Sequence, residues 1–472
     1  MKKLFQFIAI CFLLLFAEAD LLAQLSLPSI FGDNMVLQQQ TNAAIWGNAT
    51  ANATVSVRTS WNNRTVTTRA DREGLWKIKI PTPSAGGPYT VTISDGKPVT
   101  LRNVMIGEVW ICSGQSNMEM PMKGLRNQPI TGSNEYIATS TNNSIRLITV
   151  PRVTSLTPLD DFTGSWKACE PANVADFSAT AYFFGLMLQK ALNVPVGLIC
   201  TSWGGTRIEP WISEDGHKNF DWVKLPDKTQ KPDNLSSQTP TVLFNAMINP
   251  LVGYGIRGAI WYQGESNRNE PIQYQKLMPG LADNWRSVWD IGVFPFYYVQ
   301  IAPFDYGPGG LNSAYLREAQ LKAVKDGTNM GMACIMDTGE KDNIHPADKK
   351  AAGDRLAYLA LAKTYGIQGF ACEGPILKEM IVEGTLVKIT FDNAPNGLTS
   401  FGKQLSNFEV AGANKRFYPA TAFITNSGVT LFSPVVSEPV AVRYAFKDFV
   451  IGDLFNVEGL PASSFRTDDW EP

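Results

Sequence analysis

Two short motifs in this sequence carry the residue types of nucleophilic catalysis. Ser116 stands in Gly-Gln-Ser-Asn-Met at 114–118, directly after an apolar run, and a serine hydroxyl becomes a nucleophile when a base takes its proton. His345 stands in Asp-Asn-Ile-His-Pro at 342–346, and histidine is the side chain best suited to move protons near neutral pH. The carboxylate of Asp342, three residues earlier, could hold one ring nitrogen and leave the other for the serine proton.

Histidine is scarce in this chain, which narrows the choice of a catalytic base. The 472 residues contain two histidines, His217 and His345. His217 lies in the polar stretch 213–218, for which we predict a surface loop. Most Gly-x-Ser turns only cap helices, and most loop histidines are simply solvated, so neither motif is specific alone. If the protein hydrolyses a substrate through its serine, His345 is the predicted base.

Two further motifs carry groups that could stabilise negative charge. Trp-Gly-Gly-Thr-Arg occupies 203–207, and paired glycines allow backbone N–H groups to approach a ligand closely. Trp-Tyr-Gln-Gly-Glu-Ser-Asn occupies 261–267, where the amide of Gln263 or Asn267 could donate to an oxyanion. Taken singly, these are an ordinary glycine turn and a polar loop. Together with the serine and histidine motifs they gather groups suited to nucleophilic attack by a serine.

Each of the four motifs comes where an apolar run ends. These runs are short and continuous, as buried strands are, and lie at 104–112, 194–200, 256–262, 294–301 and 331–337. Apolar residues at three- and four-residue spacing predict helices at 178–193, 272–289, 313–326 and 347–365. Buried strands alternating with helices predict a parallel α/β sheet, whose ligands bind beyond the carboxyl ends of the strands. We therefore expect the four motifs at one edge of the sheet.

The regions on either side of this α/β pattern are predicted to be all-β. Apolar residues alternate with polar ones at 76–80 and again at 387–391, a period of two that marks strands with one wet face. We place a first β segment at 24–103, the α/β domain at 104–368 and a second β segment at 369–472. The second β segment either packs on the first or stands alone.

Residues 1–23 have the anatomy of a secretory signal peptide. Two lysines precede a mostly apolar run, and a small-x-small cleavage site follows it. The run is shorter than the ~20 apolar residues of a membrane span, although an N-terminal anchor helix is the alternative. We expect an exported chain, periplasmic or extracellular in a bacterium, with no stable membrane insertion after cleavage.

Composition excludes several function classes. The formal net charge is −2, which gives no basic surface for nucleic acid. Five of the six cysteines remain after the predicted cleavage, so at least one thiol is unpaired within the chain, and we expect at most one disulfide. No cysteine pair has the spacing of a zinc site, so we expect no metal. The sequence does not decide the oligomeric state.

In chain order the motifs resemble those of the sialate O-acetylesterases, a family within the wider SGNH (GDSL-like) hydrolases. The similar blocks are Gly-Gln-Ser-Asn-Met at 114–118, Ser-Trp-Gly-Gly-Thr at 202–206, Trp-Tyr-Gln-Gly-Glu-Ser-Asn at 261–267 and Asp-x-x-His at 342–345. The resemblance extends over nearly the whole mature chain. It implies a three-layer α/β/α hydrolase domain with flanking all-β segments, sandwich or jelly-roll-like. It also implies a secreted esterase that removes O-acetyl groups from sugars without a cofactor.

The resemblance also implies roles for single residues. The nucleophile would be Ser116, the general base His345 and the orienting partner of that base Asp342. The oxyanion hole would consist of the backbone N–H groups of Ser116 and Gly205 (or Gly204) and the side-chain amide of Gln263. The third block departs from the usual SGNH pattern, because Gln-Gly-Glu stands where asparagine is the common donor.

Four residues near these blocks are predicted to bind substrate: Asn117, Arg207, Glu265 and Asn267. Arg207 follows the paired glycines, so its guanidinium could pair with the carboxylate of a sialic acid. Arg126 and Arg268 are the alternative candidates for pairing with that carboxylate. Glu265 either orients His345 or binds sugar hydroxyls.

The expected partner is therefore an acetylated glycan, with O-acetylated sialic acid as the first candidate. Acetylated xylan or pectin is the alternative within the same reaction class. A different class remains open, a carbohydrate-binding protein whose β segments act beside an inactive hydrolase domain. The intact Ser116, Asp342 and His345 disfavour that class.

Overall fold

The computed structural model describes residues 25–229, 235–308 and 310–470. The predicted signal peptide at 1–23 lies outside the described residues. In the part of the chain that is described, no helix is long and apolar enough to cross a membrane.

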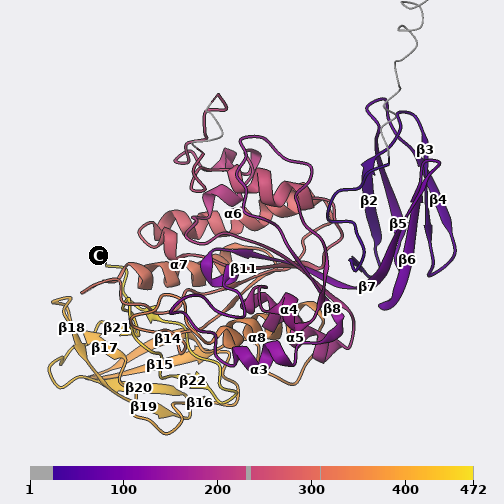
Figure 1. Cartoon of the computed structure of the whole chain (residues 1–472). Helices are drawn as coiled ribbons and strands as arrows, with labels where there is room; N and C mark the ends of the chain where they lie inside the picture. The colour runs from indigo at the N-terminus through magenta and orange to yellow at the C-terminus, as the bar shows by residue number, and fades with distance from the viewer. Residues whose placement is uncertain (1–24, 230–234, 309, 471–472) are drawn as a thin grey trace, which may run out of the picture.

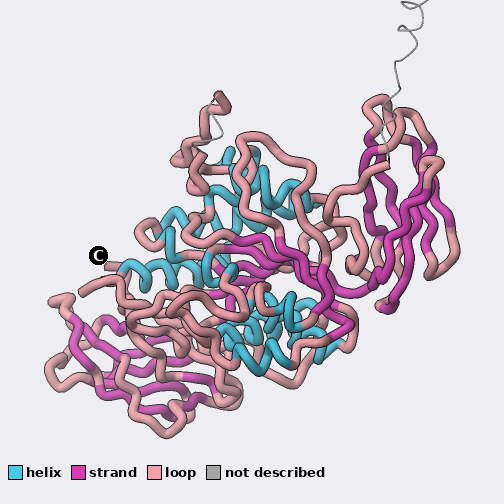
Figure 2. The backbone as a smooth tube through the Cα atoms, viewed as in Figure 1, coloured by secondary structure: helices cyan, strands magenta, loops and turns pink. Residues whose placement is uncertain are grey.

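A mainly parallel sheet forms the middle of the molecule (Figures 1 and 2). Its strands are β7 (Pro98–Gly114), β8 (Asn142–Thr149), β9 (Lys167–Cys169), β10 (Val196–Ser202), β11 (Gly258–Tyr262), β12 (Phe296–Val299) and β13 (Met330–Ala333). They are arranged in the order β13-β12-β11-β7-β10-β8-β9. Neighbouring strands are parallel except at β9, which is antiparallel to β8. All five predicted apolar runs form strands of this sheet, and β8 and β9 are additional strands.

Helices cover both faces of the sheet (Figure 1). The helices are α2 (Ser116–Glu119), α3 (Ser133–Ala138), α4 (Pro171–Val174), α5 (Ala179–Leu192), α6 (Pro271–Trp289), α7 (Asn312–Asp326) and α8 (Lys349–Leu359). Short turns of 3-10 or π-helix are η1 (Glu209–Trp211), η2 (Asp215–Asn219), η4 (Phe244–Ile248), η5 (Asn249–Leu251), η6 (Glu265–Asn267) and η7 (Ala360–Thr364). The four predicted helices correspond to α5, α6, α7 and α8 with η7. The mixed α/β class is confirmed.

Adjacent residues of the central strands point into different hydrophobic cores. Val109 and Ile111 of β7 belong to the core that includes the buried side chains of α6. Trp110 and Cys112 belong to the core that includes those of α5 and α8. Because side chains alternate across a strand, a strand covered on both faces needs apolar residues at every position. This is why the sheet strands are continuous apolar runs in the sequence.

The N-terminal β segment is joined to the sheet through one long strand. Its strands are β1 (Val36–Gln38), β2 (Asn42–Asn48), β3 (Thr54–Thr59), β4 (Thr65–Arg69), β5 (Leu75–Pro81) and β6 (Gly86–Ser94). Strand β6 pairs with the first half of β7, whereas β10 pairs with β7 from Glu108 onward. The predicted boundary at 103 falls inside β7, so the division into domains there stays a prediction.

The C-terminal β segment lies at the opposite end of the molecule from β2–β6 (Figure 1). It contains β14 (Ile376–Glu383), β15 (Leu386–Asp392), β16 (Leu398–Thr399), β17 (Phe408–Ala411), β18 (Phe417–Pro419), β19 (Thr421–Thr425), β20 (Gly428–Phe432), β21 (Ala441–Tyr444), β22 (Phe455–Asn456) and β23 (Phe465–Arg466). The buried Arg317 of α7 holds it, since its guanidinium donates to Ser464 Oγ and to the carbonyl of Lys447. The second β segment therefore packs on the α/β part of the chain and not on the first β segment.

The cysteines of the described residues are all reduced. They are Cys112, Cys169, Cys200, Cys334 and Cys372, and the first four are buried. Burial is the principal cause that raises the pKa of the Cys169 thiol to about 12 and that of Cys200 to about 11, so these thiols behave as small apolar side chains.

Candidate active site

Ser116 stands at the point where the order of the sheet reverses direction. The strands that flank β7 are β10 on one side and β11 on the other, so β7 is the topological switch point at which α/β sheets bind ligands. Gly114 ends the strand with φ +138°, and a Cβ there would lie 2.1 Å from the carbonyl oxygen of Tyr262. Glycine is thus required where the chain turns. Ser116 begins α2 directly after this turn and remains half-buried.

The paired glycines after β10 lie against Ser116. A Cβ added to Gly204 would be 3.2 Å from the Cβ of Ser116, and the Gly204 N–H donates to Glu119 Oε2 at 2.5 Å. Gly205 has φ +75° and open space on its Cβ side. Among the described residues, neither the Gly205 N–H nor the Ser116 N–H has an acceptor. Both backbone groups are free to donate to a ligand at the serine.

The loop between β13 and α8 brings His345 to the same place. Asn343 fixes this loop, because its side chain accepts from the His345 N–H at 3.1 Å and donates to the His345 carbonyl at 2.8 Å. Asn117, the neighbour of Ser116, donates to the carbonyl of Ile344 at 3.2 Å. The serine turn and the histidine loop are therefore tied together at the residues beside each catalytic candidate. No direct hydrogen bond joins the two described side chains of Ser116 and His345.

The environment of His345 favours its neutral form. Partial burial, together with the positive charge of Lys349, lowers its pKa to about 4. The Nδ1 atom is buried and has no partner among the described residues, so Nε2 is the nitrogen left to meet a substrate. Asp342 is exposed and its carboxylate does not hydrogen-bond to the His345 ring. The predicted Asp342–His345 pair is thus close in the chain but not in contact in this structure.

A buried polar network lies beneath Ser116. The Asn117 amide donates to Glu265 Oε1 at 2.6 Å and accepts from Lys349 Nζ at 2.5 Å. Burial is the principal cause that raises the pKa of the Glu265 carboxyl. Burial also lowers the pKa of the Lys349 ammonium to about 7. Asn117 is 1% exposed and Glu265 is buried as well, which speaks against the predicted contact of either residue with substrate.

Gln263 and Asn267 are also engaged inside the protein. The Gln263 amide donates to the carbonyl of Thr206 at 3.1 Å and to Asn267 Oδ1 at 2.8 Å, which uses both of its N–H groups. Asn267 in turn accepts from the Ile208 N–H and donates to Glu209. Both side chains are buried. In this conformation Gln263 has no N–H left for an oxyanion, and both Oδ1 and Nδ2 of Asn267 are hydrogen-bonded to other protein groups.

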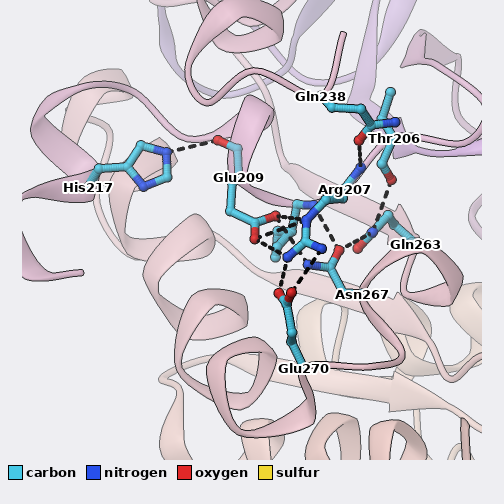
Figure 3. Close-up of polar contacts among 9 residues, drawn as sticks. Thr206, Arg207, Glu209, His217, Gln238, Gln263, Asn267 and Glu270 are labelled. Carbon is cyan, nitrogen blue, oxygen red and sulfur yellow. Dashed lines mark hydrogen bonds and ion pairs between the residues drawn. The ribbon is translucent and has the colours of Figure 1, made fainter. Parts of the chain in front are cut away.

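Arg207 does not present a free cation. Its guanidinium donates to both Glu209 and Glu270 (Figure 3). Burial by itself would lower the pKa of Arg207, but the two carboxylates raise it overall. Because two carboxylates already face it, Arg207 is a poor receptor for a third one. The predicted pairing of Arg207 with a substrate carboxylate is not supported by this geometry.

The second histidine is part of the same Arg207 cluster. His217 lies on η2 and is 3% exposed, so the predicted surface loop is wrong. Its Nε2 donates to the carbonyl of Glu209 at 2.8 Å (Figure 3). Burial lowers the pKa of His217. The apolar neighbour Phe220 covers the ring, a contact that the polar sequence around His217 did not indicate.

The sequence analysis missed three residues of the site. Glu119 anchors the Gly204 N–H and pairs with Arg152 at 3.1 Å. Arg152 lies 5.9 Å from the ring centroid of Trp203, and more than half of its side chain is exposed. Lys349 could have been noticed, because it stands on the apolar face of α8 with Ala352. Arg152 gives no such signal, since it lies in an irregular segment.

Nothing in the described part of the chain gathers three or more His, Cys, Asp or Glu side chains that could hold a metal ion. The groups that can act at Ser116 are backbone N–H groups and a histidine. Such groups suit the attack of a hydroxyl on a carbonyl and the stabilisation of the resulting oxyanion.

Comparison with known proteins gives both the class and the family of this α/β protein, and the class is an ester-hydrolysing enzyme. The chain belongs to the carbohydrate esterase, sialic acid-specific acetylesterase family, whose model matches residues 106–362. This match spans the sheet from β7 through α8, including all four motifs.

Relatives are similar over most of the chain. The sialate O-acetylesterase of Mus musculus is 29% identical over 89% of this chain and 88% of its own length. That of Homo sapiens is 30% identical over 80% of this chain and 79% of its own length. The crystal structure of a carbohydrate acetylesterase from Xanthomonas citri is 34% identical, with a TM-score of 0.86, and covers 95% of this chain and 100% of the other. The sequence resemblance to the sialate O-acetylesterases is confirmed.

Proposed function

We propose that this protein is a serine esterase of SGNH type that removes O-acetyl groups from sugars through an acetyl-enzyme on Ser116. The observation that carries the proposal is the meeting of three elements at the switch point of the sheet. The Ser116 turn follows β7, the Gly204–Gly205 turn follows β10 and lies against Ser116, and Asn117 ties the His345 loop to the Ser116 turn. The helices on both faces of the sheet support the three-layer arrangement.

In the first half of the reaction, Ser116 Oγ attacks the acetyl carbonyl carbon while His345 Nε2 takes the hydroxyl proton. The C–O bond to the sugar then breaks, and the sugar oxygen takes the proton from His345. In the second half, His345 takes a proton from water, and the hydroxide attacks the acetyl-enzyme. Acetate leaves, and the proton returns to Ser116 Oγ.

The oxyanion of each tetrahedral intermediate needs hydrogen-bond donors. The free N–H groups of Gly205 and Ser116 support this role, and such donors are each worth about 10²–10³ in kcat. The Gln263 side chain is proposed here to hold the Gly-Gly turn through the Thr206 carbonyl and not to donate to substrate itself.

Asp342 is the proposed orienting partner of His345. The loop has four carboxylates, and three of them have other partners: Asp337 pairs with Arg355, Glu340 accepts from the Ala347 N–H, and Asp348 accepts from the Ala351 N–H. Asp342 has no such bond among the described residues. A turn of this side chain toward His345 Nδ1 would satisfy the buried, unpaired nitrogen.

The substrate we propose is an O-acetylated sugar, with O-acetylated sialic acid first because the matched relatives are sialate O-acetylesterases. A sialic acid has a carboxylate, for which Arg152 is a better receptor than Arg207. Arg152 is exposed, pairs with a single carboxylate and lies beside Trp203. Acetylated neutral polysaccharide is the second candidate, because the similar Xanthomonas citri protein is described only as a carbohydrate acetylesterase. We also propose export through the segment 1–23.

The Ser116→Ala variant tests the reaction. Purified wild type should release acetate from an aryl acetate, and the variant should lose activity by several powers of ten, on the order of 10⁶. Unchanged circular dichroism and melting temperature would show that the variant is folded. If the variant keeps more than a few per cent of the activity, Ser116 is not the nucleophile.

Arg152→Met tests the substrate. The kcat/KM of wild type and variant is compared on an aryl acetate, an O-acetylated sialoside and an acetylated xylo-oligosaccharide. If Arg152 meets the sialate carboxylate, loss should be selective for the sialoside, by about tenfold for a partly exposed pair. Equal effects on all three substrates would favour a neutral polysaccharide.

A further inference from the structure

One buried charge in the site has no part in the reaction described above. Lys349 is 1% exposed, although lysine is almost never fully buried unless it is paired. Its ammonium donates to Asn117 Oδ1 at 2.5 Å and to the Pro346 carbonyl at 2.9 Å. It also lies 5.9 Å from the ring centroid of Tyr262. A buried ammonium is costly, so its place directly behind the serine and histidine motifs calls for a physical explanation.

The contacts of Lys349 join the two halves of the site. Its ammonium hydrogen-bonds to Asn117, which follows Ser116, and to the carbonyl of Pro346, which follows His345. Asn117 also donates to Glu265 and to the Ile344 carbonyl. The side chain of Asn117 therefore has its orientation fixed on both its oxygen and its nitrogen.

Burial is the first cause that lowers the pKa of His345, and the positive charge of Lys349 is the second. The charged side chains of the loop and of the first turn of α8 are Asp337, Glu340, Lys341, Asp342, Asp348, Lys349 and Lys350, and Glu265 of η6 lies behind Asn117. Glu340 and Asp348 are occupied by backbone N–H groups, Asp342 is exposed, and Glu265 is buried behind Asn117. Asp337 pairs with Arg355 and Lys350 pairs with Asp354, and Lys341 is exposed, so Lys349 is the buried cation of this set. It stands four residues after His345, and a positive charge near the imidazole disfavours a second positive charge there.

We propose that Lys349 is a positioning residue that locks the Ser116 turn to the His345 loop and keeps the imidazole of His345 neutral. This inference rests on the proposed role of His345 as the base. The pKa of Lys349, about 7, lies above the pKa of His345, about 4. Lys349 is therefore charged throughout the acidic range in which His345 titrates. The consequence is an esterase that stays active below the pH at which an ordinary histidine base would be protonated.

The test compares the dependence of kcat/KM on pH for wild type, Lys349→Met and Lys350→Met on an aryl acetate. Lys349→Met keeps the length of the side chain and removes its charge. We expect its acidic limb to move to higher pH by about one unit, and its plateau to fall by about tenfold because Asn117 loses a partner. Lys350 is the matched control, since it is the next residue, is half-exposed and pairs with Asp354. Lys350→Met should keep the wild-type profile.

An unchanged acidic limb in Lys349→Met would overturn the inference, even if the plateau fell. If Lys349→Met does not fold, Lys349→Arg replaces it, and this charge-retaining variant must keep the acidic limb of wild type. A limb that moves upward in Lys349→Arg would equally overturn the inference.

A direct measurement separates this inference from the proposed function. The chain has two histidines, so in the His217→Gln variant the one histidine NMR signal that changes with pH belongs to His345. We expect the His345 imidazole to titrate well below ~6.5, and at higher pH once Lys349 is Met. A wild type that releases no acetate would refute the esterase, whereas a His345 signal that titrates near its ordinary value would refute only the role of Lys349.

Discussion

The two histidines of this chain have nearly the same immediate chemistry but occupy different places in the fold. Both have pKa values lowered chiefly by burial, and in both the Nδ1 atom is buried without a partner. His217 donates its Nε2 proton to the Glu209 carbonyl and is covered by Phe220. His345 remains partly exposed on a loop tied to the Ser116 turn.

This difference shows what makes a histidine available for catalysis. Burial lowers the pKa in either region, so a lowered pKa does not distinguish the two. Around His217, the ion-paired cluster of Arg207, Glu209 and Glu270 is closed on itself (Figure 3). Around His345, neither ring nitrogen has a hydrogen-bond partner among the described residues, and the same holds for the backbone N–H groups of Ser116 and Gly205. The region with free donors at the sheet edge is the one that can take a substrate.

The largest expected effect separates the two histidines directly. His345→Ala should lower kcat/KM on an aryl acetate by about 10⁴–10⁶, because the proton of Ser116 then has no acceptor. His217→Gln should change kcat/KM by less than about threefold, within the range of substitutions that do not touch the reaction. The reverse result would assign the base to His217.

The next effect concerns the partner of the base. Asp342→Asn should lower kcat by about 10²–10⁴, because an amide cannot stabilise the imidazolium that forms during the reaction. Asp348→Asn on the same loop is the control, since an asparagine side chain also caps a helix. If Asp342→Asn is as active as wild type, Asp342 stays exposed during the reaction and does not orient His345.

A smaller effect is expected from a substitution of Arg207. It should lower the stability of the protein more than it changes the selectivity between substrates. Arg207→Met leaves the buried carboxylate of Glu209 without its partner. The free energy of unfolding should fall by about 3–5 kcal/mol, as for other buried pairs broken on one side. Urea denaturation measures this loss. A stable variant with selective loss on a sialoside would restore Arg207 as the receptor of the substrate carboxylate.

The smallest effect follows from the titration of both histidines. Each has a folded pKa below its value in the unfolded chain, ~6.5, so the unfolded chain binds more protons as the pH falls below that value. Stability is then fully present above pH ~6.5 and declines toward pH 4, where His345 titrates in the folded protein. Each histidine contributes a slope of at most about 1.4 kcal/mol per pH unit. His217→Gln should reduce the slope of unfolding free energy against pH between 6.5 and 5, and an unchanged slope would contradict the burial of its neutral form.

Local pattern determined much of this protein in advance. The five continuous apolar runs and the four periodic segments predicted the parallel sheet and its helices, because strands covered on both faces cannot alternate. The same patterns placed Ser116, Gly205 and His345 beyond strand ends, where a parallel sheet brings such residues together. The residue types of the four motifs and their order along the chain were sufficient to indicate the family.

What the sequence could not decide depends on which atoms meet across long separations. Asn117 and Gln263 have the same functional groups as a substrate-binding or oxyanion residue, and only the partners at Lys349, Thr206 and Asn267 show that these groups are used inside the protein. The cation at Arg207 is likewise cancelled by Glu270, 63 residues away. Hydrogen bonds saturate, so a polar side chain is available to a ligand only if the tertiary structure leaves it unpaired, and no local pattern records that.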